Sequence, residues 1–231
     1  MIIQPLSDLH GRLPEIPDCD LLLLAGDICP GSDADAQLGW LDTEFRGWLE
    51  QLRQRNIIIV GIAGNHDFVF EQLPLEVEDL RLPWTYLQDS GCEIVRLPGR
   101  AVPLSMPVTI WGTPWVPNLK NWAFCTTERQ LSARADLIPD DTDIIISHTP
   151  PWGGGSGYEK GWDFTDPQHG SVHAGDININ HAIKRVEPRF VICGHIHEGR
   201  GRYGTGKTAV INASYLDGWY KGELIPDQIV Y

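Results

Sequence analysis

The sequence predicts an α/β fold. Short apolar runs rich in β-branched residues recur along the chain and end in small or polar residues, which is typical of buried strands. Between the second and third runs, apolar residues recur at intervals of three and four across residues 33–55, which predicts an amphipathic helix. The chain therefore opens in the order strand, strand, helix, strand. In such folds the carboxyl ends of parallel strands are where ligands usually bind.

Five runs that end in polar residues predict strands at 2–6, 21–25, 57–63, 143–146 and 189–193. Pro5 makes the first strand short or irregular, because proline donates no hydrogen bond to a ladder. Further helices are expected at 71–82, 126–135 and 175–186, and closing strands at 208–212 and 223–230. Residues 86–91 predict a turn, followed by a meander with strands at 93–97, 100–103 and 108–112. Residues 150–173 lack any period and predict a long loop over the site.

Length and composition narrow the class of protein. A chain of 231 residues fits one domain, so residues 1–231 are expected to form a single unit. Acidic residues outnumber basic ones by 31 to 18, which argues against long nucleic acids as partners. The five cysteines have no paired spacing and predict reduced thiols in the cytoplasm. No apolar run approaches the roughly 20 residues of a membrane span, so no membrane association is expected.

Metal-binding residue types gather at the ends of these strands. If the extended period of two continues past the first strand, Asp8 and His10 point the same way. The others are Asp27, Asn65, His66, His148, His195 and His197. The alternative is a set of ordinary polar turns. Oxygen and imidazole ligands without thiolate suit Mn²⁺, Fe or Zn²⁺, and there are more of them than one ion needs, which favours two ions sharing a carboxylate.

The polar segments also occur in a familiar order. Asp-Leu-His at 8–10, Gly-Asp at 26–27, Gly-Asn-His-Asp at 64–67, Ser-His at 147–148 and Gly-His-Ile-His at 194–197 resemble the five blocks of the calcineurin-like metallophosphoesterase superfamily. Within it, residues 87–90, 148–151, 194–199 and 211–214 resemble the small metallophosphoesterase-domain proteins regarded as class III phosphodiesterases. The resemblance spans nearly the whole chain.

This resemblance implies a two-sheet mixed β-sandwich flanked by helices. It also implies one metal ion held by Asp8, His10 and His197, a second held by Asn65, His148 and His195, and Asp27 as the bridge. His66 would face the substrate and be oriented by Asp67. Mn²⁺ is the first expectation for both ions, with Fe, Zn²⁺ or Ni²⁺ as the other choices.

The expected activity is hydrolysis of small phosphodiesters, such as cyclic nucleotides, by a metal-bridging hydroxide, with His66 stabilising or protonating the leaving oxygen. A phosphomonoesterase, acting on nucleotides or proteins, is the alternative. A non-catalytic scaffold is disfavoured because no ligand block is damaged. The oligomeric state stays open.

For several other side chains, a functional role competes with a structural one. A nucleobase would stack on an exposed tryptophan, although packing is the default for Trp115, Trp152 and Trp162. Arg200 and Arg202 are either phosphate contacts or solvated surface residues. Loop or surface positions, rather than metal binding, are expected for His169, His173 and His181.

Overall fold

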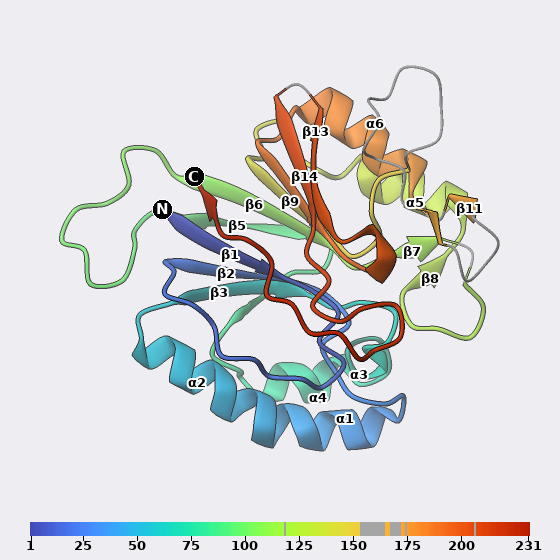
Figure 1. Cartoon of the computed structure of the whole chain (residues 1–231), viewed down its shortest axis with the longest axis horizontal. Coiled ribbons are helices and arrows are strands. Elements are labelled where there is room, and N and C mark those ends of the chain that lie inside the picture. Colours follow the sequence, from blue (N-terminus) through green and yellow to red (C-terminus); the bar gives the residue numbers. More distant parts are fainter. Residues whose placement is uncertain (118, 153–164, 167–171, 174, 206) are drawn as a thin grey trace.

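Two sheets pack face to face in the computed structural model, and helices cover the outer face of each sheet (Figure 1). The structure describes residues 1–117, 119–152, 165–166, 172–173, 175–205 and 207–231. The predicted mixed sandwich flanked by helices is therefore confirmed. None of the helices in these ranges is long and apolar enough to cross a membrane.

The first sheet has the strand order β15-β1-β2-β3-β4. Neighbouring strands from β1 to β4 run parallel, and β15 pairs antiparallel with β1. The paired register sets Pro5 beside Leu23, and β15 reaches β1 only at Ile2 and Ile3, so the Pro5 end of β1 has a partner on one side. The strands are β1 (Ile2–Leu6), β2 (Leu21–Ala25), β3 (Ile58–Ile62), β4 (Thr85–Tyr86) and β15 (Ile229–Val230).

The second sheet has the order β13-β14-β12-β9-β6-β5. Its four central strands run parallel, and β13 and β5 pair antiparallel at the two edges. Its strands are β5 (Ser90–Ile94), β6 (Val108–Thr113), β9 (Ile144–Ser147), β12 (Phe190–Cys193), β13 (Gly201–Thr205) and β14 (Thr208–Asn212). Two small ribbons pair β7 (Val116–Pro117) with β8 (Cys125–Thr126) and β10 (Thr165–Asp166) with β11 (Val172–His173).

The predicted helix at 33–55 forms as one continuous helical run. It comprises α1 (Ala34–Trp40), a π-helical turn (Leu41–Phe45) and α2 (Arg46–Gln54), and the side chain of Asp33 caps its start. The helix expected at 71–82 is instead two short helices, α3 (Phe68–Gln72) and α4 (Pro74–Asp79), because Pro74 starts a new helix. The remaining helices are α5 (Glu128–Ala135), α6 (Ile177–Val186) and a 3-10 turn at His197–Gly199.

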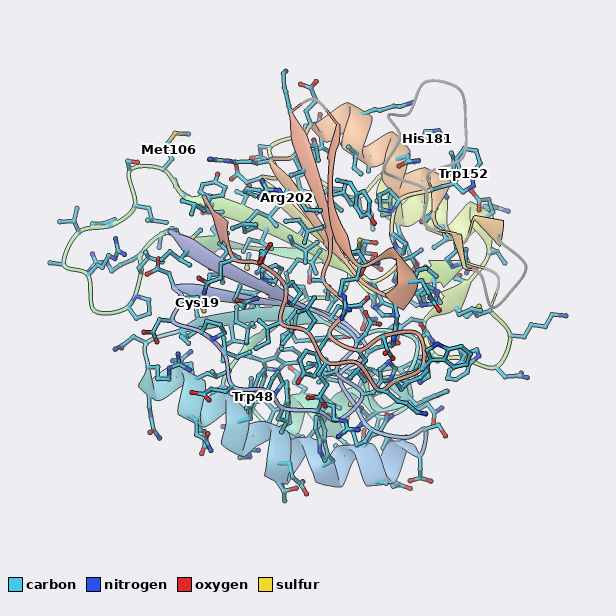
Figure 2. All side chains as sticks on the ribbon, in the orientation of Figure 1. Cys19, Trp48, Met106, Trp152, His181 and Arg202 are labelled. Atoms are coloured by element: carbon cyan, nitrogen blue, oxygen red, sulfur yellow. The ribbon has the colours of Figure 1, made fainter. Side chains whose placement is uncertain are left out.

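The apolar core has three layers. One lies between the first sheet and the long helical run, where Trp48 of α2 packs toward the strands (Figure 2). The second fills the space between the two sheets, with Ile62 of β3 and Ile146 of β9 among its members. The third lies between the second sheet and helices α5 and α6. These layers fix both sheets relative to each other, and with them the ends of their strands.

The predicted meander is wrong in its middle. No strand forms between Ile94 and Val108, and β5 already begins at Ser90, where a turn was expected. Residues 95–107 contain three prolines and have no strand beyond β5 to pair with, so they form an exposed loop whose Met106 lies at the outer edge of the molecule (Figure 2). The closing strand expected at 223–230 shrinks to β15, and β13 was not predicted.

Candidate metal centre

The two sheets are joined where their parallel strands end. The N–H of Ser7, directly after β1, donates to the Ala213 carbonyl after β14 over 2.9 Å. The N–H of Tyr215 donates back to the Ser7 carbonyl over 2.8 Å. The strand ends of both sheets therefore meet at one edge, as the sequence predicted for its polar residues.

Four of the predicted ligands have left-handed backbone conformations. Positive φ angles occur at Asp8 (54°), His10 (45°), Asp27 (52°) and His195 (68°). The extended period assumed for Asp8 and His10 is therefore wrong. The reason is that their N–H groups donate to the carbonyls of Gly26 and Asp27, both over 3.0 Å, which curls the chain around the end of β2. Non-glycine residues in this region are uncommon and concentrate at functional sites.

The first predicted ligand set comes together. Ligand atoms of Asp8, His10 and His197 lie within 4.8 Å of one another. His197 Nδ1 lies 2.9 Å from the Asp217 carbonyl, which only accepts, so Nδ1 is the donor and Nε2 faces Asp8 Oδ1 at 3.4 Å. The Ser214 hydroxyl donates to Asp8 Oδ2 over 2.7 Å. Both outer contacts orient ligand atoms toward a common point.

The second set gathers around His148. Its Nε2 lies 3.0 Å from Asn65 Oδ1 and 3.3 Å from Asp27 Oδ1, while its Nδ1 lies 2.8 Å from the Ala25 carbonyl. The His195 ring lies 5.1 Å from the His148 ring, centroid to centroid, and its backbone N–H donates to the Asp8 carboxylate. All members of the second set are therefore neighbours.

Asp27 lies between the two sets. Its Oδ2 is 3.8 Å from His10 Nε2 of the first set, and its Oδ1 is 3.3 Å from His148 Nε2 of the second. Both carboxylate oxygens of one residue thus face opposite ligand groups, which is the arrangement that a bridging role requires.

These donors fit divalent cations. His10 Nε2 is buried and has no hydrogen-bond partner among the described residues, although buried polar atoms are nearly always paired. Two acceptor oxygens, from Asn65 and Asp27, converge on His148 Nε2. Such a concentration of lone pairs is stabilised by a cation, and the mixture of imidazole, carboxylate and amide donors is one that divalent transition metals accept.

Small residues let the strand ends approach so closely. A Cβ atom on Gly26, whose φ is +93°, would lie 2.6 Å from His148 Nδ1 and 2.7 Å from the Ala63 carbonyl oxygen. A Cβ atom on Gly64 would overlap Asp27 Oδ1. The glycines before Asp27 and Asn65 are therefore needed for the ligands to meet.

His66 lies beside the same carboxylate. Its Nε2 is 4.0 Å from Asp27 Oδ2, and its backbone N–H donates to Asp27 Oδ1 over 2.8 Å. His66 also forms a possible ligand group with His10 and Asp27. The position thus suits the predicted catalytic role, and it also makes metal binding by His66 an alternative to test.

Asp67 is fully buried and accepts three backbone hydrogen bonds. Its Oδ1 accepts from the N–H groups of Ile28 (2.9 Å) and Cys29 (2.7 Å), and its Oδ2 accepts from Gly64 (2.8 Å). Burial and the neighbouring Asp27 charge raise the pKa of Asp67 to about 6. Because these contacts tie the loop after β3 to the loop after β2, any orientation of His66 by Asp67 acts through the backbone.

Replacing Asp67 with alanine is expected to lower the free energy of unfolding by about 3–5 kcal/mol, because three buried N–H groups lose their acceptor. Asp67→Asn keeps one acceptor oxygen and is expected to lose less. Urea unfolding of both variants and the parent chain measures the difference. A loss below about 1 kcal/mol for Asp67→Ala would show that the three hydrogen bonds accepted by Asp67 contribute little to stability.

The charges of the site predict how metal affinity depends on pH. Burial opposes protonation of His148 and His197, but Asp27 and Asp8, respectively, outweigh it and raise each pKa to about 9. Burial lowers the pKa of His10 and of His195 to about 4. In the metal-free chain at pH 7, two histidines therefore carry a proton that an ion must displace.

His148 and His197 bind a proton below about pH 9, and a metal ion must displace that proton to bind. Metal affinity is therefore expected to fall as the pH falls. From pH 8 to pH 6, the affinity of each ion should decrease about tenfold per unit. Competition with a chromogenic chelator at several pH values measures this slope. A pH-independent affinity over this range would contradict the assignment of His148 and His197 as ligands.

Other sequence candidates lie apart from this centre or belong to its packing. Trp115 donates from Nε1 to Asp89 and has the Arg134 guanidinium 3.5 Å above its ring, so it is a packing residue. Arg200 donates to the Tyr215 carbonyl, and Arg202 is exposed on β13 (Figure 2). Trp152 and the exposed His181 are seen in Figure 2, whereas Trp162, His169 and most of the predicted 150–173 loop lie outside the described residues.

The calcineurin-like phosphoesterase family matches residues 3–199, a span that includes every predicted ligand. The chain belongs to this family. Its membership and the clustered donors support a site for divalent metal ions.

Relatives of known sequence support the same family. A UPF0046 protein from Caenorhabditis elegans is 30% identical over 226 residues, which cover 88% of this chain and 53% of the relative. Metallophosphoesterase domain-containing protein 1 from Homo sapiens is 30% identical over 237 residues, which cover 90% of this chain and 64% of that protein. The chain thus spans between about half and two thirds of the length of these relatives.

A solved structure shares the fold. The protein TT1561 of Thermus thermophilus superposes with a TM-score of 0.58 at 15% identity, covering 91% of this chain and 88% of that one. At this identity the likeness concerns the fold alone.

Proposed function

We propose that this chain is a dinuclear phosphodiesterase that hydrolyses small phosphodiesters, such as cyclic nucleotides. The observation that carries the proposal is the position of Asp27, whose two oxygens face His10 on one side and His148 on the other, with His66 beside it. A shared carboxylate between two ligand sets favours two ions over one.

The chain's own residues have separate tasks. Asp8, His10 and His197 would hold one ion, Asn65, His148 and His195 the other, and Asp27 both. When bound, the ions would lower the pKa of a water molecule and offset the charge of the phosphoryl oxygens. His66 would donate a proton to the leaving oxygen as its bond to phosphorus breaks.

The charge balance supports a phosphoester substrate. Two divalent ions outweigh the Asp8 and Asp27 carboxylates, so the centre is positive and attracts a phosphate oxygen. Among the described residues, Asp8 and Asp27 form ion pairs with histidines of the site.

The partners and compartment are part of the same proposal. A net charge of −13 disfavours long nucleic acids and favours a small phosphoester as substrate. All five cysteines are free, which agrees with a reducing compartment such as the cytoplasm. Carboxylate and amide oxygens mixed with imidazole nitrogens suit Mn²⁺, which is our first choice, with Fe, Zn²⁺ or Ni²⁺ as the alternatives.

The test is hydrolysis of bis(4-nitrophenyl) phosphate and 4-nitrophenyl phosphate by chelator-stripped protein refilled separately with each of the four metals. We expect a higher kcat/KM for the diester, activity only after refilling, and two ions per chain by elemental analysis. A preference for the monoester would favour the phosphomonoesterase, and full occupancy without turnover of either ester would contradict both activities on these substrates.

A further inference from the structure

Two partly exposed aromatic side chains stand at the ends of a row of rings in the metal centre. The Tyr220 ring lies 4.8 Å from the His10 ring, His10 lies 4.6 Å from His66, and His66 lies 4.3 Å from Trp122, all between centroids. Tyr220 also lies 5.0 Å from His197. The two inner rings belong to the site, and the two outer ones have no role in it so far.

Trp122 is held in place by the loop between β7 and β8. The next residue, Ala123, donates its N–H to the Asn65 carbonyl over 3.1 Å, and Phe124 donates its N–H to the Glu71 side chain over 2.8 Å. These bonds fasten the loop to the segment that carries Asn65 and His66. With 37% of its surface exposed, Trp122 keeps part of its ring open to solvent beside His66.

Tyr220 is held by a tight turn between β14 and β15, in the red segment of Figure 1. Asp217 builds this turn, because its Oδ1 accepts from the N–H groups of Trp219 and Lys221 and its carbonyl accepts from Tyr220. The same carbonyl accepts from His197. One residue thus orients a ligand and places an aromatic ring over it.

The backbone of Tyr220 indicates that this placement is imposed. Its φ is 58°, which is rare for a bulky residue, and the residue is 46% exposed. Residues held in rare backbone conformations cluster at active sites and ligand-binding segments. The neighbouring Trp219 is 75% exposed and serves as a comparison.

We propose that Trp122 and Tyr220 form an aromatic clamp that binds the planar substituents of a phosphodiester on either side of its phosphorus. This inference rests on the proposed function and narrows its substrate class to open-chain diesters with an aryl or nucleobase group on each side of phosphorus, because a cyclic nucleotide joins both ester oxygens to one ribose. Trp122 adjoins His66, the proposed proton donor, so it contacts the leaving group. Tyr220 adjoins His10 and His197, so it contacts the substituent that stays on phosphorus.

Two substrates with the same leaving group separate these roles. Bis(4-nitrophenyl) phosphate retains an aryl group after cleavage, whereas methyl 4-nitrophenyl phosphate retains a methyl group. Because stacking on an aromatic ring typically stabilises a planar group enough to change affinity about 5- to 100-fold, Tyr220→Leu should raise KM about tenfold for the first ester and leave the second unchanged. Trp122→Leu should raise KM about tenfold for both.

Two control variants distinguish stacking from structural damage. Tyr220→Phe keeps the ring and should retain the parent KM for both esters, and Trp219→Leu removes an exposed aromatic ring from the same turn and should also leave KM unchanged. An equal rise in KM for both esters in Tyr220→Leu, or a similar rise in Trp219→Leu, would overturn the clamp.

A binding measurement keeps the test independent of turnover. Calorimetric titration of the Mn²⁺-loaded protein with phenylphosphonate and methylphosphonate should show about tenfold tighter binding of the aryl compound, and the double variant Trp122→Leu/Tyr220→Leu should lose this preference. If neither diester is cleaved but the preference is present, the proposed function fails and the clamp stands. If both are cleaved and no preference is found, the clamp fails alone.

Discussion

Asp27→Asn is expected to lower kcat/KM for a diester by at least about 10³-fold and to release bound metal. Asparagine keeps the shape of the side chain but loses its charge, and one of its two positions becomes an NH₂ group. Asp27 Oδ1 and Oδ2 face His148 and His10, respectively, so neither ligand set keeps its shared anion. The effect should therefore appear in the occupancy of both ions.

The matched control for this variant is Asp18→Asn. Asp18 precedes β2, whereas Asp27 follows it, and the exposed Asp18 carboxylate pairs only with Arg55 in the described contacts. We expect this control to retain its metal and its activity. Elemental analysis with parallel steady-state kinetics measures both quantities. If Asp27→Asn kept two ions and activity within about tenfold of the parent, Asp27 would not be the bridge.

The sequence predicted which polar residues gather at this site because the signal is local. A buried strand such as Leu21–Ala25 is an unbroken apolar run, and the residues that follow it are the ones at the sheet edge. Parallel pairing of β1, β2 and β3 then carries Asp8, Asp27 and Asn65 to the same edge. The second step assumes only that neighbouring strands pair in parallel, and it requires no particular side-chain contact.

The sequence could not predict the geometry between these residues. The left-handed conformations of Asp8 and Asp27 depend on hydrogen bonds between loops that lie about 18 residues apart, as Asp8 N–H with the Gly26 carbonyl illustrates. Trp122 and Tyr220 were missed for the same reason. They lie in irregular loops without periodicity, and only long-range bonds such as Ala123 to Asn65 bring them to the site. In the sequence, these two residues are marked only by the other aromatic residues that lie near them in their loops.

His66→Ala is expected to lower kcat about 10²- to 10⁴-fold for diesters with a strongly basic alkoxide leaving group, while both ions remain bound. The contact of His66 with Asp27 Oδ1 is made by the backbone N–H, over 2.8 Å, and alanine preserves it. The loss should therefore come from the missing proton donor and not from a displaced carboxylate. The matched control is His181→Ala, an exposed histidine on α6, which should keep full activity.

The dependence on the leaving group distinguishes a proton donor from a metal ligand. A weakly basic leaving group such as 4-nitrophenolate departs with little help, so the defect of His66→Ala should be small for its esters and larger for alkyl esters. The alternative follows from the group formed by His10, Asp27 and His66. If His66 were a ligand, the variant would lose metal, excess Mn²⁺ would restore its activity, and the defect would be the same for every leaving group. Rates for a series of esters, each measured at two metal concentrations, decide between the two roles.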